Sequence, residues 1–282
     1  MILFKKTTDL HKYLDVQLLN GSTIGFVPTM GALHSGHISL IKASKKENKI
    51  TVCSIFVNPA QFNDPNDFEK YPVTTEKDIY LLEAAGCQVL FLPLVKEIYP
   101  EGMNPKMYYD LGYLEKVLEG KFRPGHFRGV CMVLHRLLEI VKPSRLYLGQ
   151  KDYQQYMVVR KLIELIRMPE VQIVICPTLR EADGLAMSSR NMRLTGDERK
   201  KAAGIYKCLD FIKQNLNSIN LIQLKINALQ LLGQAGFKVD YIEIADANNL
   251  EPVTRWDGKQ KLIALVAAFL NEVRLIDNML LS

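Results

Sequence analysis

Short apolar runs alternate with segments of helical periodicity over the first two thirds of the chain. Five apolar runs have the character of strands buried on both faces of a parallel sheet: residues 23–29, 50–57, 87–93, 145–150 and 171–177. Helical periodicity occurs between runs, over residues 38–49, 76–85, 130–141 and 153–166. This alternation predicts an α/β fold, a Rossmann-like doubly wound parallel sheet, with ligands at the carboxyl ends of the strands.

The last hundred residues have a different order of elements. Two helical segments, 196–215 and 219–235, precede three β-type runs, which cover residues 238–246, 261–270 and 273–281. Helices grouped first and strands grouped last predict a smaller C-terminal α+β domain with an antiparallel sheet. We expect domains at residues 1–180 and 181–282, a division that 282 residues can support.

Charge and cysteine content narrow the class of protein. The net charge of +6 suits an anionic substrate, but no block of consecutive Lys and Arg predicts nucleic-acid binding. The five cysteines are widely spaced without a C-x-x-C pair, as in a reduced protein. No apolar run is long enough for a membrane span. We therefore expect a cytoplasmic protein without membrane or nucleic-acid partners.

The stretch "FVPTMGALHSGHISLI", residues 26–41, places His34 and His37 where a strand gives way to a helix. A metal site, a phosphate site and ordinary turn chemistry are the three interpretations. Helical metal pairs are usually spaced i, i+4 with a carboxylate nearby, which this stretch lacks. A helix N-terminus attracts anions, and Gly31 and Gly36 allow close approach of the backbone. The fold context favours phosphate binding.

A second motif, "SIFVNPAQF", follows the next strand. Asn58 and Gln61 are neutral amides that can orient hydroxyls and a carboxylate, although Asn-Pro is also a common turn signal. The polar loop at 63–74 is long enough to act as a lid.

Three further segments carry polar side chains suited to an anion. The first, "GKFRPGHFRGV", holds Arg123 and His126 before a helix and is either an anion-binding loop or a solvated one. The second, "YLGQKDYQQY", offers Lys151 for phosphate, while Asp152 either caps a helix or meets a ribose hydroxyl. The third, "MSSRN" at 187–191, is either a phosphate clamp or a simple turn.

Taken together, the motifs resemble the pantothenate synthetase family (pantoate–β-alanine ligases) of the HIGH-motif nucleotidyltransferase superfamily. The matching segments are "PTMGALHSGH", "FVNPAQF", "RPGHFRGV", "GQKDYQQ" and "READGLAMSSRN", in family order and at similar spacing. The resemblance implies an AMP-forming, ATP-dependent carbon–nitrogen ligase. Pantoate and ATP would form pantoyl adenylate and pyrophosphate, and β-alanine would then displace AMP to give pantothenate.

The resemblance also implies roles for individual residues. His37, His34 and Lys151 would be catalytic, with His37 as proton donor. ATP would be bound by Met30, Gly31, His34, His37, Gly149, Lys151, Asp152, Leu179, Met187, Ser188, Ser189 and Arg190, the last four in the place of the KMSKS loop. Pantoate and β-alanine would be bound by Gln61, Gln155, Asn58, His126 and Arg123. Mg²⁺ would be held mainly by phosphate oxygens, with Asp78 as a possible protein ligand, and the protein would be a homodimer.

Two positions depart from the family pattern. Gln150 stands where many relatives carry an acidic residue, and Ala60 where a larger residue is expected. Two alternatives stay open: another HIGH-type nucleotidyltransferase, or a nucleotide sensor without catalysis. A sensor needs affinity only, and not groups that act in the transition state.

Overall fold

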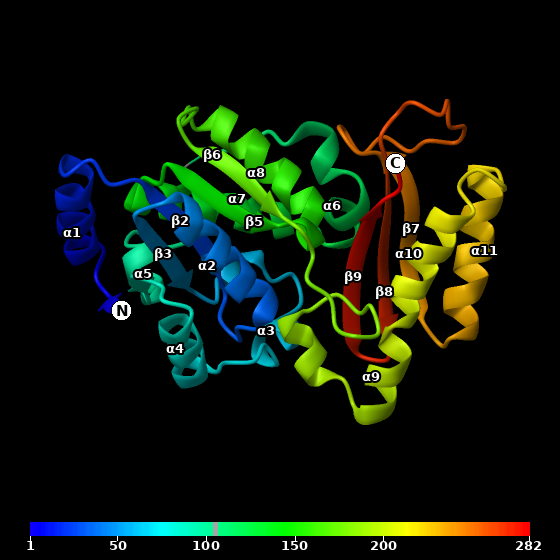
Figure 1. Cartoon of the computed structure of the whole chain (residues 1–282), viewed down its shortest axis with the longest axis horizontal. Helices are drawn as coiled ribbons and strands as arrows, with labels where there is room; N and C mark the ends of the chain where they lie inside the picture. Colours follow the sequence, from blue (N-terminus) through cyan, green and yellow to red (C-terminus); the bar gives the residue numbers. More distant parts are fainter. Residues whose placement is uncertain (104–106) are drawn as a thin grey trace. The chain divides into compact units, whose positions relative to one another are not determined.

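The computed structural model describes residues 1–103 and 107–282, and the chain divides into two compact units (Figure 1). The N-terminal unit contains Met1–Gly149 and Gln155–Pro177, and the C-terminal unit contains Gln150–Gln154 and Thr178–Ser282. The second junction follows Pro177, close to the boundary expected between residues 180 and 181. Sequence patterns did not predict that Gln150–Gln154 belong to the C-terminal unit.

The N-terminal unit is built on a six-stranded parallel sheet, as the α/β alternation predicts. Its strands are β1 (Ile2–Phe4), β2 (Ile24–Thr29), β3 (Ile50–Ile55), β4 (Val89–Phe91), β5 (Arg145–Gly149) and β6 (Gln172–Cys176). They lie in the order β1-β4-β3-β2-β5-β6, so the direction of winding reverses between β2 and β5. In doubly wound sheets ligands bind at such a reversal. The edge strand β1 was not predicted, because a run of three residues shows no periodicity.

Helices cover both faces of this sheet, because successive strand residues point to opposite sides. Phe26 packs in a core with α1 (Thr7–Leu19), α7 (His126–Val141) and α8 (Tyr153–Leu165), while Val27 packs in a second core with α2 (Ser35–Glu47) and α4 (Thr75–Ala84). The shorter helices of the unit are α3 (Pro65–Glu69), α5 (Val95–Ile98), α6 (Leu118–Phe122), η1 (Pro59–Gln61) and η2 (Gly112–Glu115).

Helix α7 begins four residues before the predicted start at Val130. Its N-cap, Gly125, has a left-handed backbone with φ 81°, and His126 and Phe127 are already buried. The prediction was late because His126, Arg128 and Gly129 interrupt the apolar pattern. His126 therefore lies in the first turn of a helix, and not in the basic loop that the sequence predicted.

The C-terminal unit is an antiparallel sheet with two helices packed on it (Figure 1). Strands β7 (Lys238–Asp246), β8 (Leu262–Leu270) and β9 (Val273–Leu280) follow one another in that order, as predicted. The segment predicted as one helix over 196–215 forms two, α9 (Gly196–Ala202) and α10 (Gly204–Gln214), followed by α11 (Leu221–Gln234). Gly204, a weak helix former, stands at the break.

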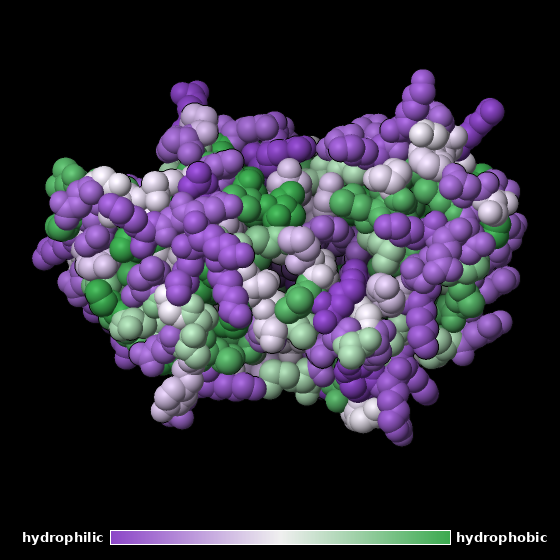
Figure 2. Space-filling view, viewed as in Figure 1, coloured by the Kyte–Doolittle hydropathy of each residue, from purple (hydrophilic) through white to green (hydrophobic). Residues whose placement is uncertain are grey.

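In the described parts of the chain, no helix combines the length and the apolar character needed to cross a membrane. Figure 2 shows hydrophilic side chains across the visible face of each unit, with smaller groups of apolar side chains among them.

Candidate active site

The two histidines form the start of helix α2. His34 is the N-cap and its Nδ1 accepts the Gly36 N–H at 3.1 Å, while Nδ1 of His37 accepts the His34 N–H at 3.3 Å. Each backbone donor would otherwise lack a partner at the helix end. The two rings lie 4.1 Å apart between centroids. Turn chemistry is therefore present at the Nδ1 atom of each ring.

The capping bonds determine which nitrogen of each ring carries hydrogen. A nitrogen that accepts a hydrogen bond carries no hydrogen, so a neutral His34 or His37 is protonated on Nε2. Both imidazoles are then Nε2–H donors at the N-terminus of a 13-residue helix. The helix dipole favours an anion at this end. The arrangement is suited to binding phosphate oxygens.

The loop before α2 is held by Asp78 of α4. Its Oδ2 accepts the Ala32 N–H at 2.9 Å, and its Oδ1 accepts the Leu33 N–H at 2.8 Å and the Thr74 hydroxyl at 2.9 Å. Gly31 and Ala32 both have positive φ, 83° and 50°, in the turn that presents the Ala32 and Leu33 amides to this carboxylate. The carboxylate thus occupies the anion-binding position that the loop backbone creates.

These contacts give Asp78 a structural role. The side chain is only 1 % exposed, and both of its oxygens accept hydrogen bonds. Within the described residues no group of three or more His, Cys, Asp or Glu side chains is arranged to hold a metal ion. The role of Asp78 as a metal ligand stays a prediction.

A cavity of about 210 Å³ lies at the carboxyl ends of β2, β3 and β4. Met30, Gly31 and Asp78 line it, together with the apolar segments 55–57 and 92–95. Its mostly apolar wall suits the carbon skeleton of a small ligand better than a triphosphate.

Asn58 is buried and fully engaged within the protein. Its Nδ2 donates to Gln61 Oε1 and to the Gly129 carbonyl, both at 3.1 Å, and its Oδ1 accepts the Tyr99 hydroxyl at 2.9 Å. The side chain is 1 % exposed. Asn58 therefore orients Gln61, whose Nε2 lies 2.9 Å from the Met30 sulfur.

His126 fixes the backbone of the same segment. Its Nδ1 lies 2.8 Å from the Gln61 carbonyl oxygen, and its Nε2 lies 3.1 Å from Nη1 of Arg123. A carbonyl can only accept and a guanidinium can only donate, so the ring is neutral and protonated on Nδ1. His126 and Arg123 were predicted as substrate ligands, which stays a prediction; His126 contacts the Gln61 backbone and Arg123 contacts His126.

Helix α7 approaches this segment closely at Gly129, which the sequence did not single out. A Cβ at Gly129 would lie 2.1 Å from the Ala60 carbonyl oxygen and 2.6 Å from the Cα of Gln61. We expect Gly129→Ala to lower the free energy of unfolding by about 1–3 kcal/mol, because α7 must move away from η1. Chemical denaturation measures the change.

Gly233 of α11 is the matched control for Gly129. Apart from the adjoining residues and backbone of its own helix, no described atom lies within 4 Å of the position its Cβ would take, so Gly233→Ala should be neutral or stabilising by up to about 1 kcal/mol. Equal stabilities of the two variants would contradict the close packing at Gly129.

The remaining predicted residues are divided between the two units. Gly149 ends β5 and Gln155 lies in the first turn of α8, both in the N-terminal unit. The C-terminal unit holds the predicted ATP-binding residues Lys151, Asp152, Leu179, Met187, Ser188, Ser189 and Arg190. Lys151 and Asp152 form the 3₁₀ helix η3 (Gln150–Asp152) with Gln150, and the Lys151 ammonium lies 3.7 Å from the Asp152 carboxylate.

The segment 178–191 forms a small hairpin followed by a helical turn. Arg180 and Ala186 form an antiparallel bridge, and the Met187 N–H donates to the Leu179 carbonyl at 3.0 Å. Ser188 caps the 3₁₀ helix η4 (Ser189–Arg193) by accepting the Arg190 N–H at 3.3 Å. The turn chemistry considered from the sequence is therefore present at Ser188.

The loop over 63–74, predicted to be long enough for a lid, contains α3 and an aromatic cluster. The Phe62 ring packs edge-on against Phe68 and Tyr71, with centroids 5.1 and 5.7 Å away. The segment is thus folded on itself, and its closing over a ligand stays a prediction.

Comparisons with known proteins agree with the motifs. The family model described as pantoate-beta-alanine ligase matches residues 2–280. Pantothenate synthetase of Cytophaga hutchinsonii is 44 % identical over 284 residues, with 100 % of this chain and 99 % of the relative covered. The relative from Fervidobacterium nodosum, also named pantothenate synthetase, is 44 % identical over 280 residues and is matched over 98 % of both chains.

Solved structures give the same result. Crystalline pantothenate synthetase of Thermus thermophilus superposes with a TM-score of 0.91 at 38 % identity, covering 99 % of both chains. Pantoate-beta-alanine ligase of Francisella tularensis, solved with beta-gamma ATP and beta-alanine, has a TM-score of 0.81 at 40 % identity, over 99 % of this chain and 97 % of that one. The chain belongs to the pantoate–β-alanine ligase family.

Proposed function

We propose that the protein condenses pantoate with β-alanine at the expense of ATP, giving pantothenate, AMP and pyrophosphate. The observation that carries this proposal is the family match over residues 2–280, which contains the paired histidines at the start of α2. In the first half-reaction the pantoate carboxylate attacks the α-phosphorus, and pyrophosphate leaves. In the second, the β-alanine amine attacks the acyl carbon and loses a proton, and AMP leaves.

In the N-terminal unit, His34 and His37 would donate Nε2–H to phosphate oxygens. Negative charge grows on these oxygens as pyrophosphate departs, and donors already in place stabilise that charge without reorganisation. His37 is the proposed proton donor. Met30, Gly31 and Gly149 would border the nucleotide.

Gln61 and Gln155 would hold pantoate by hydrogen bonds, with Gln61 also near the incoming amine. The bonds that Asn58 and His126 make to Gln61 support this role, because a side chain with fixed geometry loses less entropy when a substrate binds. We propose that Asn58, His126 and Arg123 act on the substrates through Gln61.

In the C-terminal unit, Lys151 would neutralise phosphate charge and Asp152 would accept a ribose hydroxyl. Leu179, which is 40 % exposed, would lie against adenine. The phosphates would be bound by Met187, Ser188, Ser189 and Arg190.

Magnesium would be bound mainly by the phosphate oxygens of ATP. The buried, fully bonded carboxylate of Asp78 fits this arrangement better than a site made of protein ligands. When bound, the ion neutralises phosphate charge and helps to orient the nucleotide.

Two further properties follow from the resemblance and stay predictions. One is a homodimer, which sedimentation analysis would test. The other is a cytoplasmic location, which the cysteines support: all five lie in the described part of the chain, buried and without disulfides.

Pyrophosphate release from ATP and magnesium tests the reaction. The purified protein is assayed with pantoate, without pantoate, and with β-alanine added. Release that depends on pantoate and turns over only with β-alanine would support both half-reactions. ATP binding without pantoate-dependent release would instead indicate a different acceptor, or a sensor.

Replacing Gln61 by alanine should weaken pantoate binding selectively. Loss of a hydrogen bond to a charged group corresponds to a rise of about 10- to 100-fold in the KM for pantoate. The KM for ATP, measured in the same assay, serves as the control. An unchanged KM for pantoate would contradict the assignment of Gln61.

A further inference from the structure

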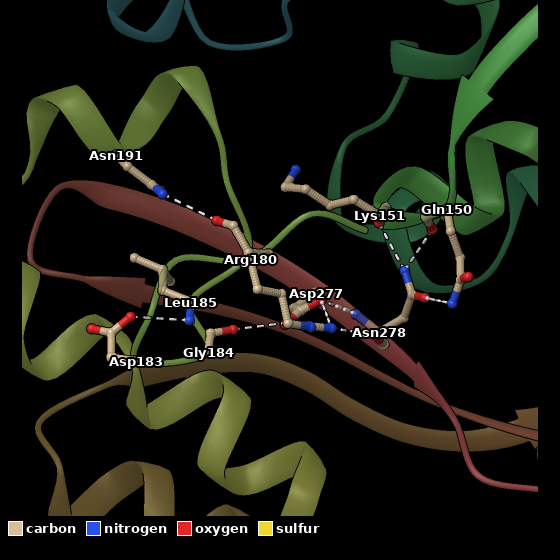
Figure 3. A network of polar contacts seen from close by, with 10 residues as sticks. Gln150, Lys151, Arg180, Asp183, Gly184, Leu185, Asn191, Asp277 and Asn278 are labelled. Carbon is tan, nitrogen blue, oxygen red and sulfur yellow. Dashed lines mark hydrogen bonds and ion pairs between the residues drawn. The ribbon is translucent and has the colours of Figure 1, made fainter. Parts of the chain in front are cut away.

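Two short segments of the C-terminal unit carry proposed ATP-binding residues, η3 and the turn at 187–190. Helix η3 has only three residues, Gln150–Asp152, so its own backbone bonds do little to define its geometry. The last strand, β9, contacts η3 through Asn278 and the hairpin that leads to 187–190 through Asp277 (Figure 3).

Asn278 binds both carbonyls at the base of Lys151. Its Nδ2 donates to the Gln150 oxygen at 2.9 Å and to the Lys151 oxygen at 2.8 Å. The side chain is 2 % exposed, so water does not replace these bonds readily. The Lys151 backbone is therefore held by a residue 127 positions later in the chain.

The side-chain amide of Asn278 also contacts the side chain of Gln150. Both hydrogens of Asn278 Nδ2 are used by the carbonyls, which leaves Asn278 Oδ1 to accept. The Gln150 amide lies 3.5 Å from this oxygen and points its donor at it. A carboxylate at position 150 would instead place an acceptor against the Asn278 Oδ1 acceptor.

Asp277 forms a bidentate ion pair with Arg180. Arg180 Nη1 lies 2.6 Å from Oδ2 of Asp277, and Arg180 Nη2 lies 3.1 Å from Oδ1. The guanidinium also donates to the carbonyls of Gly184 and Asn278 and lies over the Tyr206 ring, 5.0 Å from its centroid.

The Arg180 contacts reach the turn at 187–190 through the hairpin. Arg180 pairs with Ala186 by a backbone bridge, and the Ala186 carbonyl accepts the Asn191 side-chain amide at 3.0 Å. Asn191 belongs to η4, the turn that carries Ser189 and Arg190. One strand thus holds both segments (Figure 3).

Stability alone gives little reason for polar residues at both position 277 and position 278 of β9. Val273 and Leu275 pack in the core, and by the two-residue period of a strand Asp277 lies on their face and Asn278 on the other. Burial raises the pKa of Asp277, while Arg180 and Lys151 act in the opposite direction. Replacing a buried ion pair by apolar residues often costs no stability. We therefore infer that the Asp277–Arg180 ion pair serves to fix the geometry of the hairpin.

We propose that Asn278 is a positioning residue for ATP, which fixes the backbone of Lys151 while its neighbour Asp277 fixes the hairpin before Ser189 and Arg190. This inference rests on the proposed function for its ligand. It assigns the end of the last strand a role in nucleotide binding that acts through Lys151.

A double-mutant cycle on ATP affinity tests the proposal. Asn278→Asp keeps the shape of the side chain but replaces the two donors by an acceptor facing two carbonyls. Lys151→Ala removes the ammonium and keeps the carbonyl. The Kd for ATP with magnesium is measured by calorimetry for wild type, both single variants and the double variant.

We expect Asn278→Asp to raise the Kd for ATP by about tenfold. In the Lys151→Ala background the same change should have an effect of less than about twofold, because the ammonium that Asn278 positions through the backbone is absent. The proposal would be overturned if the rise in Kd of the double variant equalled the product of the rises in the two single variants. An unchanged Kd in Asn278→Asp would also overturn it. Asn278→Ala, which adds no charge, provides the same comparison if the aspartate variant does not fold.

Asn215→Asp is the matched control. Asn215 Nδ2 donates to the Phe211 carbonyl at 2.9 Å at the end of α10 in the same unit, so the variant loses an equivalent bond far along the chain from η3. It should lower Tm and leave the Kd for ATP unchanged. A rise in Kd equal to that of Asn278→Asp would overturn the positioning role.

The two proposals fail in different ways. Wild type that binds ATP with the expected coupling, but releases no pyrophosphate with pantoate, would remove the proposed reaction and keep the role of Asn278. Wild type that does not bind ATP would overturn both.

Discussion

Replacing His37 by asparagine should lower kcat by about 100-fold or more and leave Tm nearly unchanged. The asparagine oxygen can take the place of Nδ1 and accept the His34 N–H, so the helix cap is kept. The variant lacks a donor at the position of Nε2, where charge develops in the proposed reaction. Removal of one such donor typically costs about 10²- to 10³-fold in kcat.

His37→Gln is the matched variant, because its amide nitrogen lies near the position of Nε2. We expect it to keep more of kcat than His37→Asn with little change in Tm, because glutamine at this third helical position can also accept the N-cap N–H. The measurements are kcat and KM for ATP from pyrophosphate release, with Tm from thermal unfolding. A variant with normal turnover and only a raised KM for ATP would contradict a role in the transition state.

Replacing Asp78 by alanine should have the largest effect on stability. The change leaves the Ala32 and Leu33 N–H groups buried without their acceptor. Hydrogen bonds to a charged group contribute about 1.5–3 kcal/mol each, so we expect a loss of about 3–5 kcal/mol in the free energy of unfolding. Chemical denaturation measures the loss, and ATP affinity should fall with it, because the same loop leads into His34.

Thr74→Val is the control for Asp78. It removes only the hydroxyl bond to Asp78 Oδ1 and keeps both backbone contacts, so a loss of about 1 kcal/mol is expected.

Asp78→Asn separates the loop role from a metal role. If Asp78 were chiefly a magnesium ligand, this variant would be nearly as stable as wild type and would need more magnesium for activity. Loss of stability at unchanged magnesium dependence is the result that the buried contacts predict.

Local patterns were sufficient for the fold class. The parallel strands around β2 and the helix α2 were predicted because each is defined by residues adjacent in the chain. The break between α9 and α10 was missed, since one glycine within a periodic segment is a weak signal. The early start of α7 was missed because polar residues occupy buried positions in its first turn.

The predicted site residues were found by motif, and their contacts were not. His34 and His37 were placed correctly at a strand-to-helix turn, but the sequence did not reveal that their Nδ1 atoms cap the helix. Asn58, His126 and Arg123 stay predicted as ligands, and the sequence did not reveal that Asn58 and His126 contact Gln61. The polar pair Asp277–Asn278 inside the apolar run 273–281 was a signal that could have been noticed.

The sequence by itself determined the alternation of strands and helices, the family, and the segments proposed to carry the chemistry, because these are encoded by neighbouring residues. Only the tertiary structure decided which groups hold those segments in place. Asp78 reaches the loop before α2 from 46 positions away, and Asn278 reaches Gln150 from 128. Hydrogen bonds over such separations leave no periodic trace in the sequence, since they depend on how the strands and loops come together.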